Sequence, residues 1–271
     1  MSRGIHDVTL GLRSDDNETY GTNTTGNVAW GITVADNTRL VTSWGNAFKA
    51  PTFNDLYWPD GANPNLKPEE SETIEVSLSN SQKDISWQAS MYQTQIDNMI
   101  EWAPLTTPPF NWAPSNIEKA DISGLELSVS KHIETWLISS SFTAIDPTYT
   151  KTVNGTNDGN TLVNRVTRSL KLDADKSWGA LDVGLSWVVE NSRYQDKANK
   201  HETAGYGLLN LRTAYNISDE LKVQFKIDNV LDKEYVTKQY SYYDAFFNQI
   251  YENYNTLGRA AFISVIYTPS F

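Results

Sequence analysis

Apolar and polar residues alternate with a period of two along most of the chain. In residues 28–34, 181–187 and 221–227, a large apolar residue occupies every second position, and small or polar residues lie between. Successive side chains of a β-strand point to opposite faces of a sheet, so this spacing predicts strands with one apolar and one polar face. No segment shows the 3.6-residue period of an amphipathic helix, and we predict an all-β protein.

The pattern predicts about twelve strands joined by links of two kinds. The strands are expected at residues 5–13, 27–35, 39–46, 72–80, 85–100, 117–132, 135–145, 166–177, 181–194, 205–217, 221–231 and 258–271. Tight turns at 36–38, 81–84, 179–180 and 218–220 alternate with long links at 14–26, 47–71, 101–116, 146–165, 195–204 and 232–257. This alternation is typical of an up-and-down barrel with short periplasmic turns and long outer loops.

We therefore predict a single domain over residues 1–271, an antiparallel up-and-down transmembrane β-barrel. The alternative is a soluble acidic β-sandwich that binds carbohydrate or another small ligand, because sandwich strands alternate in the same way. Aromatic residues on the strands fit either the membrane interface or a packed core. In the barrel, the polar face lines the interior. Its expected members are Glu75, Glu126, Lys171, Asp173, Asp175, Asp182, Asn210, Arg212, Lys222, Lys226 and Asp228. In a narrow barrel we expect them to pair across the interior and block it.

Charge and composition exclude several classes of protein. The chain has 33 acidic and 22 basic residues, a formal charge of -11 and no basic run, which argues against a nucleic-acid partner. It has no cysteine, which excludes disulfides and thiolate sites. No run of about 18 apolar residues predicts a transmembrane helix, and residues 1–5 lack the apolar region of a signal peptide.

The sequence offers little for catalysis, and we expect no enzyme, metal site or cofactor. The three histidines are far apart, and no zinc-protease, nucleophile-elbow or phosphate-loop spacing occurs. Acidic pairs at 15–16 and 69–70 are interpreted as solvated loop charge rather than as an acid/base pair of a hydrolase. The segment 154–160 is similar to a calcium loop, but Arg165 stands where a bidentate glutamate is needed.

Several motifs occur in a fixed order along the chain. Residues 44–57 read WGNAFKAPTFNDLY and residues 61–69 read GANPNLKPE. ISGLE follows at 122–126, NVLDKEY at 229–235, and the last strand closes on Phe271. Together these motifs resemble the TonB-dependent outer-membrane receptors and transporters over essentially the whole chain. Within that family the sequence is most similar to cobalamin transporters and their catecholate-siderophore relatives.

The resemblance implies import of cobalamin or a ferric siderophore, powered through TonB. Family members also have an N-terminal plug domain with a TonB box and a barrel of about 22 strands. None of the plug, the box or a signal peptide is recognisable in this sequence, which resembles the C-terminal half of the barrel. We therefore expect the chain to be transport-incompetent alone and not to engage TonB.

The small number of strands raises the question of how the sheet ends are paired. Unpaired strand edges cost several kcal/mol per group in hydrocarbon. We expect the chain to close on itself, with both termini on the periplasmic side. Pairing with another chain and a truncated or excised chain are the alternatives.

The best candidates for ligand contact are aromatic residues in the long links, where rings can stack on a planar or macrocyclic ligand. They are Tyr240, Tyr242, Tyr243, Phe246, Phe247, Tyr251 and Tyr254 in the last long link, and Trp58, Trp102 and Trp112 in two others. The alternative is that these rings pack on neighbouring loops. The expected partners are lipid of a Gram-negative outer membrane and the barrel-assembly machinery, which would recognise the strand ending at Phe271.

Overall fold

The structure is a computed structural model that describes residues 2–59, 61–104, 112–246 and 248–269. Its main element is one antiparallel sheet of 13 strands, in which each strand pairs with its neighbours in chain order. The strands are β1 (Ser2–Arg3), β2 (His6–Asn17), β3 (Gly21–Ala35), β4 (Thr38–Lys49), β5 (Glu69–Ser81), β6 (Ile85–Pro104), β7 (Trp112–Ile133), β8 (Trp136–Lys151), β9 (Arg168–Trp178), β10 (Leu181–Glu190), β13 (Tyr206–Asn216), β14 (Leu221–Asp228) and β17 (Ala260–Tyr267).

Three smaller elements lie in the long connections. Helix α1 (Phe53–Tyr57) follows β4, the short pair β11 (Arg193–Tyr194) and β12 (Glu202–Thr203) follows β10, and the hairpin β15 (Gln239–Tyr243) and β16 (Gln249–Asn253) precedes β17. No helix in the described ranges is long and apolar enough to cross a membrane.

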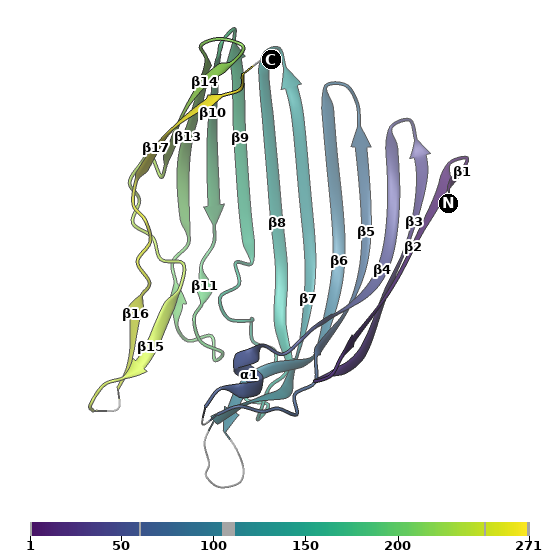
Figure 1. Cartoon of the computed structure of the whole chain (residues 1–271), viewed down its shortest axis with the longest axis vertical. Helices are drawn as coiled ribbons and strands as arrows, with labels where there is room; N and C mark the ends of the chain where they lie inside the picture. The colour runs from purple at the N-terminus through teal and green to yellow at the C-terminus, as the bar shows by residue number, and fades with distance from the viewer. Residues whose placement is uncertain (1, 60, 105–111, 247, 270–271) are drawn as a thin grey trace.

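The predicted strands and connections are largely confirmed. Each of the twelve predicted strands corresponds to one long strand of the sheet, and β1 adds a two-residue extension paired with β2. The long connections gather at the lower end of Figure 1, and the tight turns, β1 and the end of β17 lie at the upper end. The prediction that all long loops share one end is therefore correct.

The predicted long link at 14–26 is wrong. Here β2 and β3 stay paired up to Asn17 and Gly21, with the turn at residues 18–20. Strands β7 and β8 likewise extend into links that were predicted at 101–116 and 146–165. In β2 and β3 the outer parts are largely exposed on both faces, so the apolar alternation that reveals a half-buried strand is lost there. In β7 and β8 the outer parts are partly buried, but the buried side chains include Glu118 and Pro147, which give no apolar alternation.

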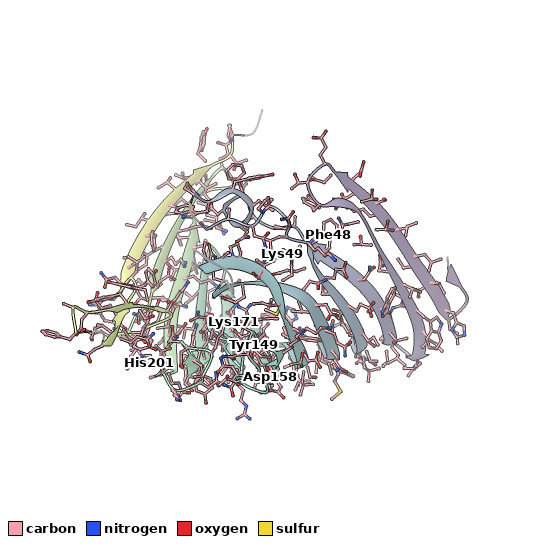
Figure 2. The ribbon with its side chains drawn as sticks, turned by 90° about the horizontal axis from the view of Figure 1, so that it is seen from below. Phe48, Lys49, Tyr149, Asp158, Lys171 and His201 are labelled. Atoms are coloured by element: carbon pink, nitrogen blue, oxygen red, sulfur yellow. The ribbon has the colours of Figure 1, made fainter. Side chains whose placement is uncertain are left out.

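The apolar face of the sheet is its outer face. Buried hydrophobic residues in the described part are confined to the loops and to strand ends near them, at Leu56, Leu66, Ala113, Ala120, Tyr149 and Leu162. By contrast, the alternating apolar residues are exposed, with Val76 at 46% and Leu185 at 43%. A β-sandwich would bury such residues between two sheets, and this single curved sheet has no second layer against them (Figure 2). The soluble alternative is not favoured.

Charged side chains of the opposite face pair along the sheet rather than across an interior. The Arg212 Nη2 atom lies 2.6 Å from the Asp175 Oδ1 atom on a nearby strand, and Lys171 Nζ lies 3.1 Å from Asp173 Oδ2. Arg212 Nη1 also lies 3.5 Å from Asp173 Oδ1. Pairing across a narrow interior stays a prediction for a closed barrel, because the sheet is open here and the pairs found among the described residues run along the wall.

The expected self-closure is not found in the described residues. The strand order begins at β1 and ends at β17, and no ladder joins these two edges. Closure requires the number of strands, their tilt and their stagger to match. The sheet instead forms an open arc (Figure 2), so its curvature is too shallow for twelve long strands to meet.

Aromatic rings mark the end of the sheet that carries the tight turns. Trp136 and Trp178 meet edge to face with ring centroids 6.1 Å apart. Lys176 Nζ lies 4.9 Å from the Trp136 ring centroid and 4.6 Å from the Trp178 centroid. Tryptophan with a snorkelling lysine is typical of a membrane–water interface. The end of the sheet that carries the tight turns thus has the ring-and-lysine pattern expected of such an interface.

Candidate functional site

The hairpin β15–β16 presents a face of tyrosines at the loop end of the sheet. The pairing of Tyr240 with Glu252 puts Tyr240, Tyr242 and Glu252 on one face. The Tyr240 ring lies 6.1 Å from that of Tyr242 and 5.3 Å from that of Tyr254, measured between centroids. These three tyrosines are 41%, 43% and 50% exposed. We call Tyr240, Tyr242, Tyr254 and Glu252 the tyrosine face.

Glu252 organises the tyrosine face. Tyr240 Oη and Tyr242 Oη both donate hydrogen bonds to its carboxylate, the second at 2.9 Å. The bond from Tyr240, followed by that from Tyr242, holds the pKa of Glu252 below its usual range, and the same bonds raise the pKa values of both tyrosines. The face therefore combines stacking surface with a fixed negative charge.

Tyr251 lies on the opposite face of the hairpin and docks it to the sheet. Its ring stacks on His201, with centroids 3.7 Å apart and planes 16° apart. His201 Nε2 is 2.8 Å from Gln239 Oε1, and Gln239 N donates to Gln195 Oε1 at 2.9 Å. Residues 195–201, which we call the β11–β12 loop, therefore hold the hairpin in place.

Lys197 anchors the same loop to strands β6 and β7 of the sheet. Its Nζ atom lies 2.9 and 3.1 Å from the two carboxylate oxygens of Glu118 on β7, and 3.2 Å from Glu101 Oε2 on β6. Glu118 is 1% exposed. Burial raises the pKa of Glu118 and, with the two glutamates nearby, raises the pKa of the adjacent Tyr149 to about 12. We call Lys197, Glu101 and Glu118 the lysine clamp.

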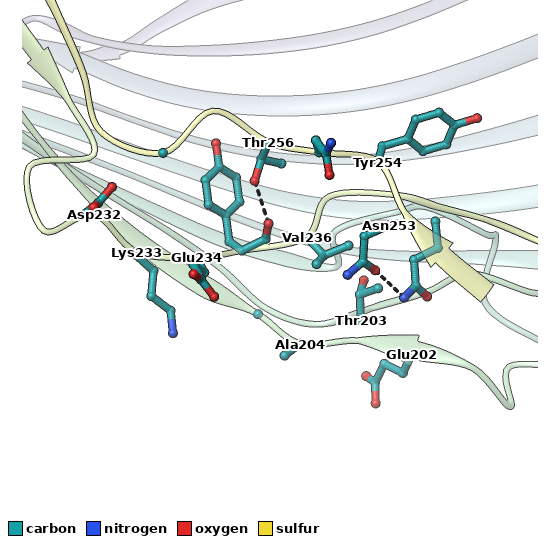
Figure 3. Close-up of a pocket in the computed structure, with 15 residues that line it drawn as sticks. Glu202, Thr203, Ala204, Asp232, Lys233, Glu234, Val236, Asn253, Tyr254 and Thr256 are labelled. Atoms are coloured by element: carbon teal, nitrogen blue, oxygen red, sulfur yellow. Dashed lines mark hydrogen bonds between the residues drawn. The ribbon is translucent and has the colours of Figure 1, made fainter.

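A polar groove of about 760 Å³ lies along the base of the hairpin (Figure 3). Its walls come from β12 and the two residues after it, the segment after β14 and the segment before β17. Gln239 Nε2 donates to Asn253 Oδ1 at 2.7 Å, and Thr256 Oγ1 donates to the Tyr235 carbonyl at 2.7 Å. Glu202 and Glu234 add carboxylates to the lining. Hydrogen-bonding groups thus continue from the tyrosine face into the groove.

The tryptophan candidates lie apart from the tyrosine face. Trp58 ends α1 and is exposed, as is Trp102 near the end of β6. In Figure 1, α1 lies near the middle of the loop end, whereas β15–β16 lies at the left. No ring contact between described residues joins the two groups.

The remaining candidates lie either at the tip of the hairpin or outside the described part of the structure. Phe246, at the tip of the hairpin, is 83% exposed. Phe247 and Phe271, together with the side chains of Tyr243 and Trp112, lie outside the described part of the structure.

The motifs that carry the resemblance hold the loops to the sheet. Asn63 Nδ2 donates to the buried carbonyl of Pro114 at 3.0 Å, and Asn116 exchanges hydrogen bonds of 2.8 Å with the backbone of Lys67. Glu69 accepts from the Ile100 amide at 2.9 Å. The Asn-Pro-Asn-Leu-Lys-Pro-Glu segment is thus a docking segment rather than a ligand site.

Sequence reasoning missed the groove and the lysine clamp. Glu118 and Lys197 are 79 positions apart, and neither stands in a motif or a periodic pattern. Glu202, Gln239 and Asn253 are ordinary polar residues within links. Only the pairing of long strands brings these residues together. In the described ranges, no three His, Asp or Glu side chains gather as a group that could hold a metal ion.

The sheet is curved, with an apolar outer face and a polar inner face. It has tight turns at one end and long loops at the other. These features together are typical of the wall of an outer-membrane receptor barrel. The chain belongs to the TonB-dependent receptor-like β-barrel family, whose profile matches residues 6–230. The resemblance found in the sequence motifs is thereby confirmed.

Relatives with known names are transporters and receptors rather than enzymes. The chain is 34% identical over 230 residues to the vitamin B12 transporter BtuB of Photobacterium profundum, covering 84% of this chain and 37% of the relative. It is 33% identical over 237 residues to BtuB of Vibrio vulnificus, covering 88% of this chain and again 37% of the relative.

Solved structures share the fold. The siderophore receptor PirA from Acinetobacter baumannii matches 97% of this chain and 43% of its own, with a TM-score of 0.75 at 19% identity. The copper transporter OprC matches 97% of this chain and 46% of its own, with a TM-score of 0.73 at 19% identity. The chain thus spans less than half the length of the proteins it matches, and the expectation of a missing plug stays a prediction.

Proposed function

We propose that this chain forms part of the barrel wall of an outer-membrane receptor that imports a cobalamin-like corrinoid, and that the tyrosine face makes contact with that ligand. The observation that carries the proposal is the set of three exposed tyrosine rings at the loop end of a chain similar in sequence to vitamin B12 transporters. Large planar rings stack well on aromatic side chains. The amide-lined groove beside this face supplies donors and acceptors for the amide groups on the rim of a corrinoid.

A ferric siderophore is the second candidate, supported by the fold shared with siderophore receptors. Charge favours the corrinoid. A ferric tris-catecholate is an anion, and the fixed carboxylate of Glu252 together with Glu202 and Glu234 of the groove would repel it. A corrinoid with neutral amide groups meets no such repulsion.

Binding of cyanocobalamin to the detergent-solubilised chain tests this proposal. We expect the Tyr240→Ala and Tyr242→Ala variants to bind more weakly by about tenfold each, equivalent to about 1.4 kcal/mol for a lost stacking contact. Tyr215→Ala is the matched control, because Tyr215 is an exposed tyrosine at the opposite end of the sheet. Unchanged binding in both loop variants, or binding of ferric enterobactin in place of cyanocobalamin, would contradict the proposal.

The cellular location and the binding partners of the chain are also proposed from its resemblance to outer-membrane receptors. We propose that the outer face meets lipid of a Gram-negative outer membrane, and that the last strand guides insertion by the assembly machinery. The open edges of the described sheet support the further proposal that these 271 residues do not transport alone. Expression of the chain in a strain that lacks its own corrinoid receptor should therefore leave uptake at the background level.

A further inference from the structure

Four side-chain oxygen atoms meet on the tyrosine face. Tyr240 and Tyr242 are two residues apart on β15, so both side chains leave the same face of the hairpin, and Tyr240 pairs with Glu252 of β16. Tyr240 Oη donates a hydrogen bond to Glu252 Oε2, and Tyr242 Oη donates one of 2.9 Å to Glu252 Oε1. Each phenol therefore meets a different oxygen of the same carboxylate.

The hairpin holds these oxygen atoms in a fixed arrangement. Its two strands share five residue pairs. On the opposite face, the Tyr251 ring stacks on His201 and ties the hairpin to the β11–β12 loop. On the tyrosine face, the Tyr254 ring meets the Tyr240 ring edge to face. Groups that are held in place before a ligand binds lose less conformational freedom on binding, so this cluster is preorganised.

The surroundings of the cluster favour a cation. The negative charge of Asp244 acts on the Tyr242 hydroxyl, and Glu202 and Glu234 line the neighbouring groove. Lys238 adds one positive charge, and its Nζ atom lies 5.8 Å from the centroid of a neighbouring tyrosine ring. The whole chain has a formal charge of -11. Carboxylates thus outnumber cations near the phenols, and the hairpin attracts positive ions.

We propose that Tyr240, Tyr242 and Glu252 form a binding site for a ferric ion. Phenol and carboxylate oxygens are hard donors, and tyrosine also serves as a ligand of haem iron. When the ion binds, the two phenol O–H bonds break, the protons pass to solvent, and the phenolate oxygens and the carboxylate bind the metal. Two phenolates and one carboxylate carry three negative charges, which balance Fe³⁺ without any electron transfer.

Other metal ions fit these donors less well. Calcium and magnesium bind carboxylates, carbonyls and water, and would leave both phenols protonated. Zinc and copper sites are built largely from imidazole and thiolate groups, whereas Tyr240, Tyr242 and Glu252 offer only oxygen. A bound ion with three positive charges favours the ionised form of a hydroxyl more strongly than a divalent ion does. The phenols therefore select for a trivalent ion.

The ferric site is separate from the proposed contact with a corrinoid. The ion binds the oxygen atoms at the tips of the tyrosines, whereas a corrinoid ring stacks on their faces. Metal-site spacings of histidine, cysteine and acidic residues do not reveal this cluster, because Glu252 is ten positions from Tyr242 and reaches it through the cross-strand register.

Titration of the detergent-solubilised chain with ferric nitrilotriacetate, without any corrinoid, tests the proposal. We expect one ferric ion per chain and a visible charge-transfer band from phenolate to iron. The double variant Tyr240→Phe/Tyr242→Phe should lose the band, and Glu252→Gln should bind iron about tenfold more weakly or worse. Tyr267→Phe is the matched control, because Tyr267 makes a lone hydrogen bond of 3.4 Å to Glu220 at the other end of the sheet.

The single variants Tyr240→Phe and Tyr242→Phe provide a second test, because each leaves one phenol bonded to Glu252 and so preserves the hairpin. Each should bind iron about tenfold more weakly. The assignment would be overturned by absence of the band in the unchanged chain, or by an equal band in the double variant. Displacement of the iron by excess Ca²⁺ would also overturn it, because the carboxylate alone would then account for binding.

Discussion

Glu118 shows how one buried carboxylate connects distant loops. It lies on β7 near the loop end of the sheet and is almost fully buried, and among the described residues its ion-pair partner is Lys197 of the β11–β12 loop. Burial of a charge is unfavourable unless a partner compensates it. Lys197 opposes the rise in the pKa of Glu118 that burial causes, whereas Glu101 adds to it. The position of the loop is thus tied to the charge state of one residue.

Loss of Lys197 should leave the buried carboxylate of Glu118 without a compensating positive charge. We expect Lys197→Met to lower the free energy of opening of the β11–β12 loop by about 3 kcal/mol at neutral pH. Because the pKa of Glu118 is raised in the folded chain, its contribution to stability is complete below its unfolded pKa and is lost as the pH rises through the folded pKa. Hydrogen exchange of the loop amides should therefore show less protection at higher pH. The double variant Glu118→Gln/Lys197→Met should regain most of the protection and lose the pH dependence.

Glu252 should stabilise the hairpin at neutral pH and lose this effect in acid, the opposite of the pH dependence expected for Glu118. The pKa of Glu252 is depressed by the hydrogen bonds from Tyr240 and Tyr242, so its contribution is present above the unfolded pKa of about 4.3 and is lost as the pH falls through the folded pKa. We expect the near-ultraviolet circular dichroism of the hairpin tyrosines to weaken only under these acidic conditions. Glu252→Gln should remove this transition, and a transition that persists in the variant would argue against the arrangement.

At the scale of the element, short polar segments hold the long loops to the sheet. Helix α1 is only five residues long and relies on a capping box between Thr52 and Asp55. A helix of this length is not stable alone. The hydrogen bonds from Asn63 and Asn116 to the backbone therefore fix the whole connection between β4 and β5 against β6 and β7.

Asn63→Ala should release this connection. The substitution leaves the buried Pro114 carbonyl without its donor and also removes the acceptor for the Asn65 amide. We expect a local loss of about 1–3 kcal/mol. Limited proteolysis should show faster cleavage between β4 and β5. Asn65→Ala is the control, because the Asn65 side chain is exposed and only its backbone amide bonds to Asn63; equal cleavage rates in both variants would show that Asn63 is not the anchor.

At the scale of the whole molecule, the open sheet decides what the chain does in a membrane. The strands at its two edges, β1 and β17, have backbone groups without a strand partner, and hydrocarbon cannot form hydrogen bonds with them. Within the described residues, the concave face has salt bridges along the wall and no packed centre. The described residues therefore form an open wall in this structure, and we expect no sealed pore from them.

Planar-bilayer recordings test whether the chain can seal a pore in lipid. We expect the refolded 271-residue chain to give no stable unitary conductance, because an open sheet cannot seal a pore in lipid. Chain denatured by heat is the control for leakage by unfolded protein. Steady, reproducible steps would mean that the edges do close, either within one chain or between chains.

The local pattern was sufficient to predict most of the sheet. Alternation in residues 181–187 and 221–227 predicted β10 and β14 and the apolar face of each, because successive side chains of a strand point to opposite faces. The outer parts of β2 and β3 were missed, because both faces are wet there. The motifs at 61–69 and 229–235 indicated the family, although their structural role as docking segments was not visible in them.

Residue patterns along the chain were enough to predict the twelve long strands, their order and the end of the sheet that carries the long loops, since these features depend on neighbours in sequence. The tertiary structure was needed to show that the sheet stays open, that Lys197 reaches Glu118, and that Tyr251 stacks on His201 while Tyr240 and Tyr242 stay exposed. These contacts depend on curvature and on cross-strand register. Both arise from the whole sheet, and no window of residues contains them.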